Sequence, residues 1–257
     1  MQSIDTFLRE LCDVAEKETL PRFRNRPAVE NKHADGFDPV TMADRAAETA
    51  IRNLIYQRYP DHGVVGEEEG PVRPDAEYCW IIDPIDGTRS FICGLPSWGT
   101  LIGLVHKGKP VAGIMAQPFT GERYLGHAEG SFLAHQGKST RLSTSDVTAL
   151  KDATLMTTTP FLFAPGDIEC YRQVEARCKL ARYGYDCYAY AMLASGHIDL
   201  VIESSLKTYD IVALIPVVEN AGGVITNWDG QSAVNGGRIV AAANGVLHEA
   251  AIKLLCR

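Results

Sequence analysis

Apolar residues recur with helical spacing in two stretches near the start of the chain. The apolar face within residues 3–20 is made by Ile4, Phe7, Leu8, Leu11, Val14 and Ala15. This spacing predicts an amphipathic helix with Ser3 as its N-cap. A second helix is predicted from Thr41 to Tyr59, with Asp44 in its first turn, and the turn residues 60–63 end it.

Beyond residue 77 the pattern changes from helical to extended. Residues 78–82 form a short apolar run, which predicts a strand that stops at Asp83 and Pro84. Between residues 98 and 133, β-forming runs alternate with turn signals such as the Lys-Gly-Lys-Pro segment at 107–110. This arrangement is typical of an antiparallel meander.

After residue 145, strand and helix patterns alternate. Strands are predicted near 153–158, 179–183, 198–203, 223–226 and 238–242, and helices near 167–177, 187–195, 209–221 and 246–255. Such alternation indicates an α/β arrangement. We therefore expect an N-terminal α+β half over residues 1–145 with the antiparallel sheet, and a C-terminal α/β half over 146–257. No low-complexity linker separates them, so we expect two halves of one unit.

Charge and cysteine usage narrow the possible functions. The formal charge of −7 argues against nucleic acid or an anionic membrane as the main partner. No apolar run approaches the ~20 residues that a membrane-spanning helix needs, and no basic and apolar leader opens the chain. The seven cysteines are scattered without CxxC spacing, so a disulfide framework or zinc site is not expected and a cytoplasmic location fits best.

Acidic residues stand where α/β proteins place binding groups, at strand ends and helix starts. Three glutamates at 67–69 lie between two glycines, Asp83 and Asp86 follow the strand at 78–82, and Asp210 begins an apolar helix. Several carboxylates in one cleft need compensating charge. Oxygen ligands of this kind favour Mg²⁺ or Mn²⁺ over Zn²⁺.

Each of these residues also has a simpler interpretation. A single aspartate after a strand is more often a turn residue, and a run of glutamates is usually a solvated loop. Asp210 alone would be interpreted as a helix N-cap. The metal hypothesis depends on the residues occurring together.

Together the motifs resemble those of the inositol monophosphatase superfamily. The resemblance lies in Gly-Glu-Glu at 66–68, Trp-Ile-Ile-Asp-Pro-Ile-Asp-Gly-Thr at 80–88, Tyr209-Asp210 followed by Ala213, and the glycine pair at 222–223. It implies a five-layer αβαβα sandwich, a homodimer, and Mg²⁺-dependent, lithium-sensitive hydrolysis of small phosphate monoesters. Tyr209 is a mild departure, since many relatives have tryptophan there.

The resemblance also assigns roles to individual residues. It implies two or three Mg²⁺ ions per site, which Mn²⁺ can replace, held by Glu67, Asp83, the Ile85 carbonyl, Asp86 and Asp210, with Glu68 supporting a more weakly held ion. Asp44 would pair with Thr88 to orient the attacking water, and Glu67 would share in catalysis. The backbone amides of Gly87 and Thr88 would receive phosphate oxygens.

A narrower resemblance points to the histidinol-phosphate phosphatase branch. It lies in residues 37–41, 87–92, 94–96, 98–102 and 186–190. Inositol phosphatases typically carry Thr-Asn where this chain has Arg89-Ser90, and small residues near positions 185–187. Histidinol phosphate carries an ammonium group and an imidazole, so its pocket needs acceptors. The predicted substrate contacts are Tyr185, packing on the ring, Asp186 and Glu203, with Arg89 contacting phosphate or pinning the turn.

The sequence therefore predicts hydrolysis of L-histidinol phosphate to L-histidinol and phosphate by direct attack of a metal-activated water. This is a step of histidine biosynthesis. An inositol-1-phosphate or related sugar-phosphate phosphatase is the alternative enzyme. A non-catalytic metal- or phosphate-binding regulator is a third hypothesis, against which the Asp44 and Thr88 pair argues, because a binder has no need to orient water.

Overall fold

The computed structural model describes residues 3–25, 29–31 and 39–255. Residues 37 and 38, which contribute to the narrower resemblance, lie outside the described residues. A short antiparallel pair, β1 (Val29–Asn31) and β2 (Pro39–Thr41), leads into the second helix. The predicted first and second helices are confirmed as α1 (Ile4–Thr19) and α2 (Met42–Arg58).

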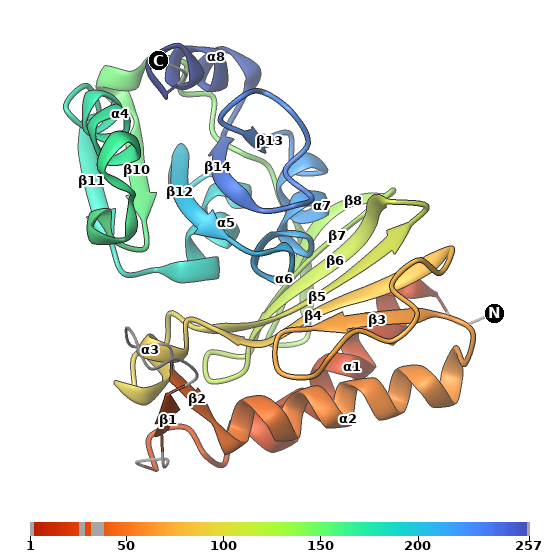
Figure 1. The fold of residues 1–257 in the computed structure, drawn as a ribbon. Helices are drawn as coiled ribbons and strands as arrows, with labels where there is room; N and C mark the ends of the chain where they lie inside the picture. The colour runs from red at the N-terminus through yellow and green to blue at the C-terminus, as the bar shows by residue number, and fades with distance from the viewer. Residues whose placement is uncertain (1–2, 26–28, 32–38, 256–257) are drawn as a thin grey trace.

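The helices α1 and α2 cover one face of a seven-stranded sheet (Figure 1). Its strands lie in chain order and are β3 (Gly63–Gly66), β4 (Tyr78–Asp86), β5 (Gly99–His106), β6 (Lys109–Gln117), β7 (Glu122–His127), β8 (Gly130–His135) and β9 (Lys138–Arg141). Only β3 and β4 pair in parallel, and the others form the predicted antiparallel meander.

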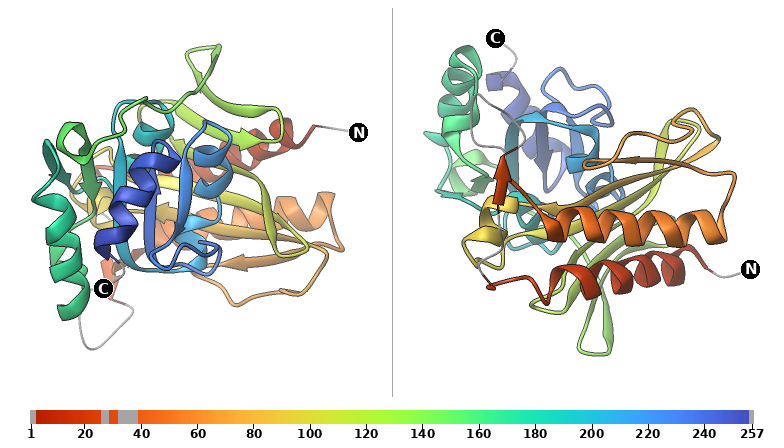
Figure 2. Two further views of the ribbon diagram at one scale, coloured as in Figure 1. Left: turned by 90° about the horizontal axis from the view of Figure 1, so that it is seen from above. Right: turned by 60° about the horizontal axis from the view of Figure 1, so that its bottom comes forward.

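The other face of this sheet is covered by α5 (Asp186–Ala194), α6 (Thr208–Ile211) and α7 (Leu214–Glu219). Next comes a five-stranded sheet in the order β11 (Leu180–Tyr183), β10 (Thr154–Thr157), β12 (Leu200–Leu206), β14 (Gly237–Ala242) and β13 (Val224–Asn227). The outer layer consists of α4 (Pro165–Glu175) and α8 (Gly245–Leu255), as Figure 2 also shows. The expected αβαβα sandwich is confirmed.

Close packing of α7 on the seven-stranded sheet joins the two halves of the chain. A Cβ atom added at Gly113 would lie 2.0 Å from the Ala213 carbonyl oxygen, and one at Gly126 would lie 2.2 Å from the Pro216 carbonyl carbon. The Ser131 hydroxyl donates to the Val217 carbonyl at 2.7 Å. The backbone of α7 and of the residue before it therefore packs directly on the backbone of β6 and β7. Only glycine permits so close an approach, because it has no Cβ atom.

Two elements differ from the sequence-based prediction. The strand predicted to stop at Asp83 continues as β4 to Asp86, with a bulge on the way. The single helix predicted at 209–221 is two helices, α6 and α7, which break at residues 212–213. Pro216 explains the break, because its ring conflicts with the carbonyl of Val212 four residues earlier and it has no N–H to donate.

Among the described residues, no helix combines the length and apolarity needed to cross a membrane.

Candidate active site

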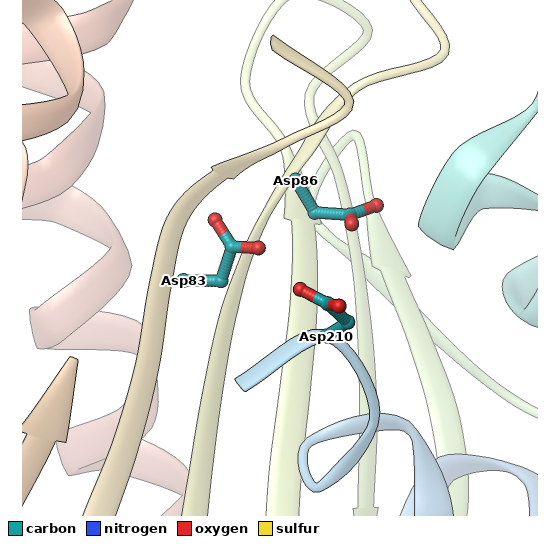
Figure 3. Close-up of side chains that lie close together, drawn as sticks. All are labelled: Asp83, Asp86 and Asp210. Carbon is teal, nitrogen blue, oxygen red and sulfur yellow. The ribbon is translucent and has the colours of Figure 1, made fainter. Parts of the chain in front are cut away.

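The bulge in β4 places two aspartates on the same side of the sheet. Asp83 lies opposite Leu101, and Asp86 lies opposite Gly99, so β4 advances three residues while β5 advances two. In a regular strand, residues three apart point to opposite faces. The extra residue of the bulge reverses this, and both carboxylates line one cleft (Figure 3).

Asp210 approaches this pair from the other half of the chain. It lies in α6, where its carboxylate accepts a hydrogen bond of 2.6 Å from the Lys207 amide. One oxygen atom from each of Asp83, Asp86 and Asp210 can be chosen so that all three lie within 4.8 Å of one another. Asp86 is held further by the Cys187 amide, which donates to it at 2.6 Å.

The glutamate loop after β3 runs beside these aspartates. The Glu67 amide donates to the Ile82 carbonyl at 3.2 Å, which continues the parallel pairing of β3 and β4. The Glu67 carboxyl group hydrogen-bonds to Asp83 and lines the same cleft. Glu68 is not among the described residues that line the cleft, so its support of a further ion stays a prediction.

Asp44 is buried in the first turn of α2. Its Oδ2 accepts from the Thr41 amide at 2.8 Å and from the Thr41 hydroxyl at 2.6 Å. Its Oδ1 is buried without a hydrogen-bond partner among the described residues. The Thr88 hydroxyl donates instead to the Ile85 carbonyl at 3.1 Å. The predicted cooperation of Asp44 with Thr88 on a water therefore involves no direct bond here and stays a prediction.

Burial and repulsion between neighbouring carboxylates raise the pKa values of Asp83, Asp86, Asp210 and Asp44. Burial is the main cause for Asp83 and Asp86, followed by repulsion from Glu67 for Asp83 and from Asp186 for Asp86. Burial raises the pKa of Asp210 to about 7 and that of Asp44 to about 6. Burial and the neighbouring carboxylates both disfavour the charged forms of these groups.

The residues fit a divalent cation. Among the described residues the cluster offers only oxygen atoms, from three aspartates and from the adjacent Glu67, and no thiolate or imidazole belongs to it. Oxygen ligands suit Mg²⁺, Mn²⁺ or Ca²⁺. A bound cation would replace the protons that the raised pKa values imply. The orphaned oxygen of Asp44 offers a further acceptor.

The cleft has a volume of about 410 Å³. Besides the acidic cluster it is lined by Gly87, Thr88, Arg89, Asp186, Glu203 and Lys207, together with neighbouring residues. The structure thus brings most of the predicted substrate contacts to the candidate metal ligands. Tyr185 is absent from the described lining. It packs against the core beneath α5, and its hydroxyl lies 3.5 Å from Arg182, so its stacking on a substrate ring stays a prediction.

Asp186 connects the substrate side of the cleft to the loop after β4. Its Oδ2 accepts from the Ser90 hydroxyl at 2.9 Å. Gly87 has a φ of +83°, and a Cβ atom there would lie 2.9 Å from Asp186 Oδ2. Burial raises the pKa of Asp186, whereas the Ser90 hydrogen bond and the charge of Arg89 lower it.

Glu203 has a structural role that the sequence does not indicate, because both of its carboxylate oxygens accept hydrogen bonds from the end of β10. Its Oε1 accepts from the amide and hydroxyl of Thr158, and its Oε2 accepts from the Thr157 hydroxyl at 3.1 Å. Burial raises its pKa to about 8. Glu203 therefore ties the end of β10 to β12, and its contact with the organic part of the substrate stays a prediction.

Three residues near the cleft were not singled out from the sequence. Lys207 lines the cleft and precedes α6. Glu48 and Arg52 form a buried ion pair behind the glutamate loop. A signal existed, because Asp44, Glu48 and Arg52 recur every four residues on one face of α2.

Comparison with known proteins agrees with this geometry. The chain matches the Inositol monophosphatase family over residues 1–257. It is 42% identical to the protein named bifunctional phosphatase IMPL2, chloroplastic, of Arabidopsis thaliana, over 95% of this chain and 72% of that protein. It is 36% identical to the histidinol-phosphatase of Mycobacterium tuberculosis, over 93% and 92% of the two chains.

A solved structure of an inositol monophosphatase from Zymomonas mobilis superposes with a TM-score of 0.87 at 39% identity and covers 98% of this chain and 97% of that one. The fold, the acidic cluster and these similarities lead to one conclusion. The chain belongs to the inositol monophosphatase family and is a phosphatase of that family.

Proposed function

We propose that this phosphatase hydrolyses L-histidinol phosphate to L-histidinol and phosphate, with Mg²⁺ as its cofactor, in histidine biosynthesis. The acidic cluster supports the metal requirement, since it gathers oxygen ligands around one point. Asp186 and Glu203, which also line the cleft, support the choice of a cationic substrate. A relative that is similar over nearly the whole chain carries the name histidinol-phosphatase.

The observation that carries the substrate assignment is the hydrogen bond between Ser90 and Asp186. These residues are 96 positions apart in the chain, yet their side chains meet at 2.9 Å beside Gly87. Both stand at positions where this sequence differs from the typical inositol phosphatase pattern. The contact therefore joins two substitutions into one feature of the cleft, and that feature presents a carboxylate to a cationic substrate.

The residues of the chain divide the proposed chemistry among them. Glu67, Asp83, Asp86 and Asp210, with the Ile85 carbonyl, would hold the cations, which when bound supply charge neutralisation of the phosphate and a lower pKa for water. Asp44 Oδ1 is the acceptor left to take a proton from the attacking water.

The loop after β4 and Asp186 would hold the substrate. The amides of Gly87 and Thr88 are the donors we assign to the phosphate oxygens, and Gly87 lines the cleft in a left-handed conformation. Asp186 would accept hydrogen bonds from the amine or the imidazole. This division fits a reaction in which positioning and electrostatics supply most of the rate enhancement.

The proposal includes a homodimer in the cytoplasm. No disulfide joins two of the described cysteines, and four of them have a pKa raised by burial, which suits packing roles in a reducing compartment. Light scattering of the purified protein would give the molar mass, and a mass of one chain would contradict the dimer.

An inositol-1-phosphate or sugar-phosphate phosphatase is the alternative. The similarity to the Zymomonas mobilis inositol monophosphatase favours it. A non-catalytic regulator is the third candidate, and it requires that purified protein release no phosphate from a panel of monoesters in Mg²⁺.

The substrate proposal is tested by comparing kcat/KM for histidinol phosphate and inositol 1-phosphate in the wild type and in Asp186→Asn. We expect the wild type to favour histidinol phosphate. Loss of a charged hydrogen-bond partner worth ~1.5–3 kcal/mol should raise KM for that substrate by roughly 10- to 100-fold. KM for inositol 1-phosphate should change little.

Asp229→Asn is the matched control, because Asp229 is not among the described lining residues of the cleft and pairs with Arg238 at the surface. An unchanged KM for histidinol phosphate in Asp186→Asn would contradict the substrate contact. A wild-type preference for inositol 1-phosphate would favour the alternative enzyme.

A further inference from the structure

We infer that the buried pair Glu48 and Arg52 on α2 is a positioning device that sets the place of Glu67 in the metal site. The inference rests on the proposed metal-dependent phosphatase function and assigns the residues that hold its glutamate loop. Neither residue touches the cleft, since neither is among its described lining residues.

Glu48 satisfies the backbone of the glutamate loop directly. Its Oε2 accepts from the Glu68 amide at 2.8 Å, and its Oε1 accepts from the Glu69 amide at 3.0 Å. Successive amides of one loop thus end on the two oxygens of one carboxylate. Hydrogen bonds from amides to a charged acceptor are stronger than those between neutral groups.

Arg52 completes the device. Its side chain lies 2.7 Å from Glu48 Oε1 in an ion pair whose side chains are 3% and 0% exposed. It also donates from Nη2 to the Glu69 carbonyl at 2.8 Å. A buried ion pair contributes little net stability, because desolvation offsets attraction. The hydrogen bonds that Glu48 and Arg52 make lie within α2 or join α2 to the glutamate loop. We therefore assign to the pair the role of fixing the geometry of that loop.

Gly66 shows how closely Glu48 approaches the loop. A Cβ atom at Gly66 would lie 2.0 Å from Glu48 Oε1, and Gly66 has no positive φ that would itself require glycine. The missing side chain therefore makes room for the carboxylate. Glu67 follows at once, held on one side by its bond to the Ile82 carbonyl and on the other by the anchored amides of the next two residues.

The same helix carries Asp44, four residues before Glu48 and on the same face. Helix α2 therefore holds the unpaired Asp44 oxygen and the Glu67 loop on one rigid element. The spacing between the acceptor for the water and a ligand of the metal site is set by this helix, not by the flexibility of a loop.

The test measures Mn²⁺ binding to metal-free protein by calorimetry, without substrate, for the wild type and Glu48→Gln. The glutamine lacks the charge, and its amide nitrogen cannot accept from a loop amide. Removing partners that orient metal ligands typically costs about 10- to 100-fold in affinity, and we expect a loss of that size. Raising Mg²⁺ should restore most of kcat, since the ligands themselves remain.

Two further variants separate the possible failures. Glu10→Gln removes the same charge from a half-exposed ion pair between Arg58 of α2 and Glu10 of α1, and it should bind Mn²⁺ as the wild type does. Asp83→Asn removes a predicted ligand and should weaken Mn²⁺ binding strongly. If Asp83→Asn binds normally, the proposed metal site itself is wrong. If Asp83→Asn is weakened but Glu48→Gln binds like Glu10→Gln, only the positioning role is overturned.

Arg52→Lys keeps the test decisive if Glu48→Gln does not fold. Lysine preserves the charge beside Glu48 but has no second donor in the fixed geometry that reaches the Glu69 carbonyl. A folded Arg52→Lys protein with several-fold weaker Mn²⁺ binding and kcat restored at high Mg²⁺ supports the inference. A folded protein with wild-type affinity overturns it.

Discussion

One oxygen of the Asp44 carboxylate caps a helix, and the other has no partner among the described residues. The cap uses both the amide and the hydroxyl of Thr41. Burying the second oxygen unpaired costs about 1–3 kcal/mol, so its retention indicates a ligand or a water as partner. At the residue scale, a water or ligand bound at this oxygen is what the proposed role of Asp44 in turnover requires.

Asp44→Asn should lower kcat by about 10²-fold or more, because the amide cannot accept the proton of an attacking water. The cap can persist through the amide oxygen, so the fold should be kept. Steady-state kinetics at saturating Mg²⁺ measure the effect, and Mn²⁺ affinity checks that the metal ligands are intact. A variant with wild-type kcat would remove Asp44 from the reaction.

At the scale of elements, a bulge and two glycine contacts position the cleft. The bulge in β4 turns Asp83 and Asp86 to one side, and the approach of α7 to β6 and β7 carries α6, with Asp210, over that strand. Gly113 and Gly126 allow the approach. The distance between the carboxylates of the two halves therefore depends on backbone packing far from any ligand.

Gly113→Ala should destabilise the protein by at least about 1–3 kcal/mol, the usual cost of overpacking, because its Cβ would meet the Ala213 backbone at 2.0 Å. Gly166→Ala is the control. That glycine lies in α4 with open space around its Cβ position, and helix propensity favours alanine by roughly 1 kcal/mol. Urea unfolding of both variants measures the difference. Equal stability of the two would contradict the packing argument.

The sequence revealed the site's chemistry better than its geometry. Asp83, Asp86, Glu67 and Asp210 could be proposed as metal ligands because their motifs together resemble those of the inositol monophosphatase superfamily. The bulge between Asp83 and Asp86 could not be predicted, because it depends on the register in which β4 pairs with β5, which the apolar pattern does not reveal.

The break between α6 and α7 was readable from Pro216, but the continuous apolar run of residues 211–218 concealed it. The partners of buried polar residues were harder still to predict. Glu48 looks like a solvent-facing helix residue until β3 brings the glutamate loop against it.

At the scale of the whole molecule, the acidic cluster opposes folding at neutral pH when no cation is bound. Folded pKa values of about 6 for Asp44, about 7 for Asp210 and about 8 for Glu203 lie above the ordinary values. A raised folded pKa contributes stability that is complete at low pH and is lost as the pH rises through that value. The metal-free protein should therefore lose stability between roughly pH 4 and pH 8 through these groups.

Mg²⁺ should raise the melting temperature more at pH 8 than at pH 5, because the ligands must lose protons to bind it. At a hundredfold excess over Kd the stabilisation is ~2.7 kcal/mol, which corresponds to a shift of several degrees in a chain of this size. Thermal melts with Mg²⁺ and with EDTA at both pH values measure it. A larger shift at pH 5 would contradict the assignment of the raised pKa values to a metal site.

The most direct test of the central claim is phosphate release from histidinol phosphate by the wild type and Asp83→Asn across a Mg²⁺ titration. The proposed metal site at the bulge of β4 predicts that wild-type release depends on Mg²⁺ and is abolished by EDTA. It also predicts that Asp83→Asn stays folded by circular dichroism yet releases no phosphate in excess Mg²⁺. Near-wild-type turnover by Asp83→Asn in excess Mg²⁺ would contradict a catalytic metal centre at Asp83, Asp86 and Asp210.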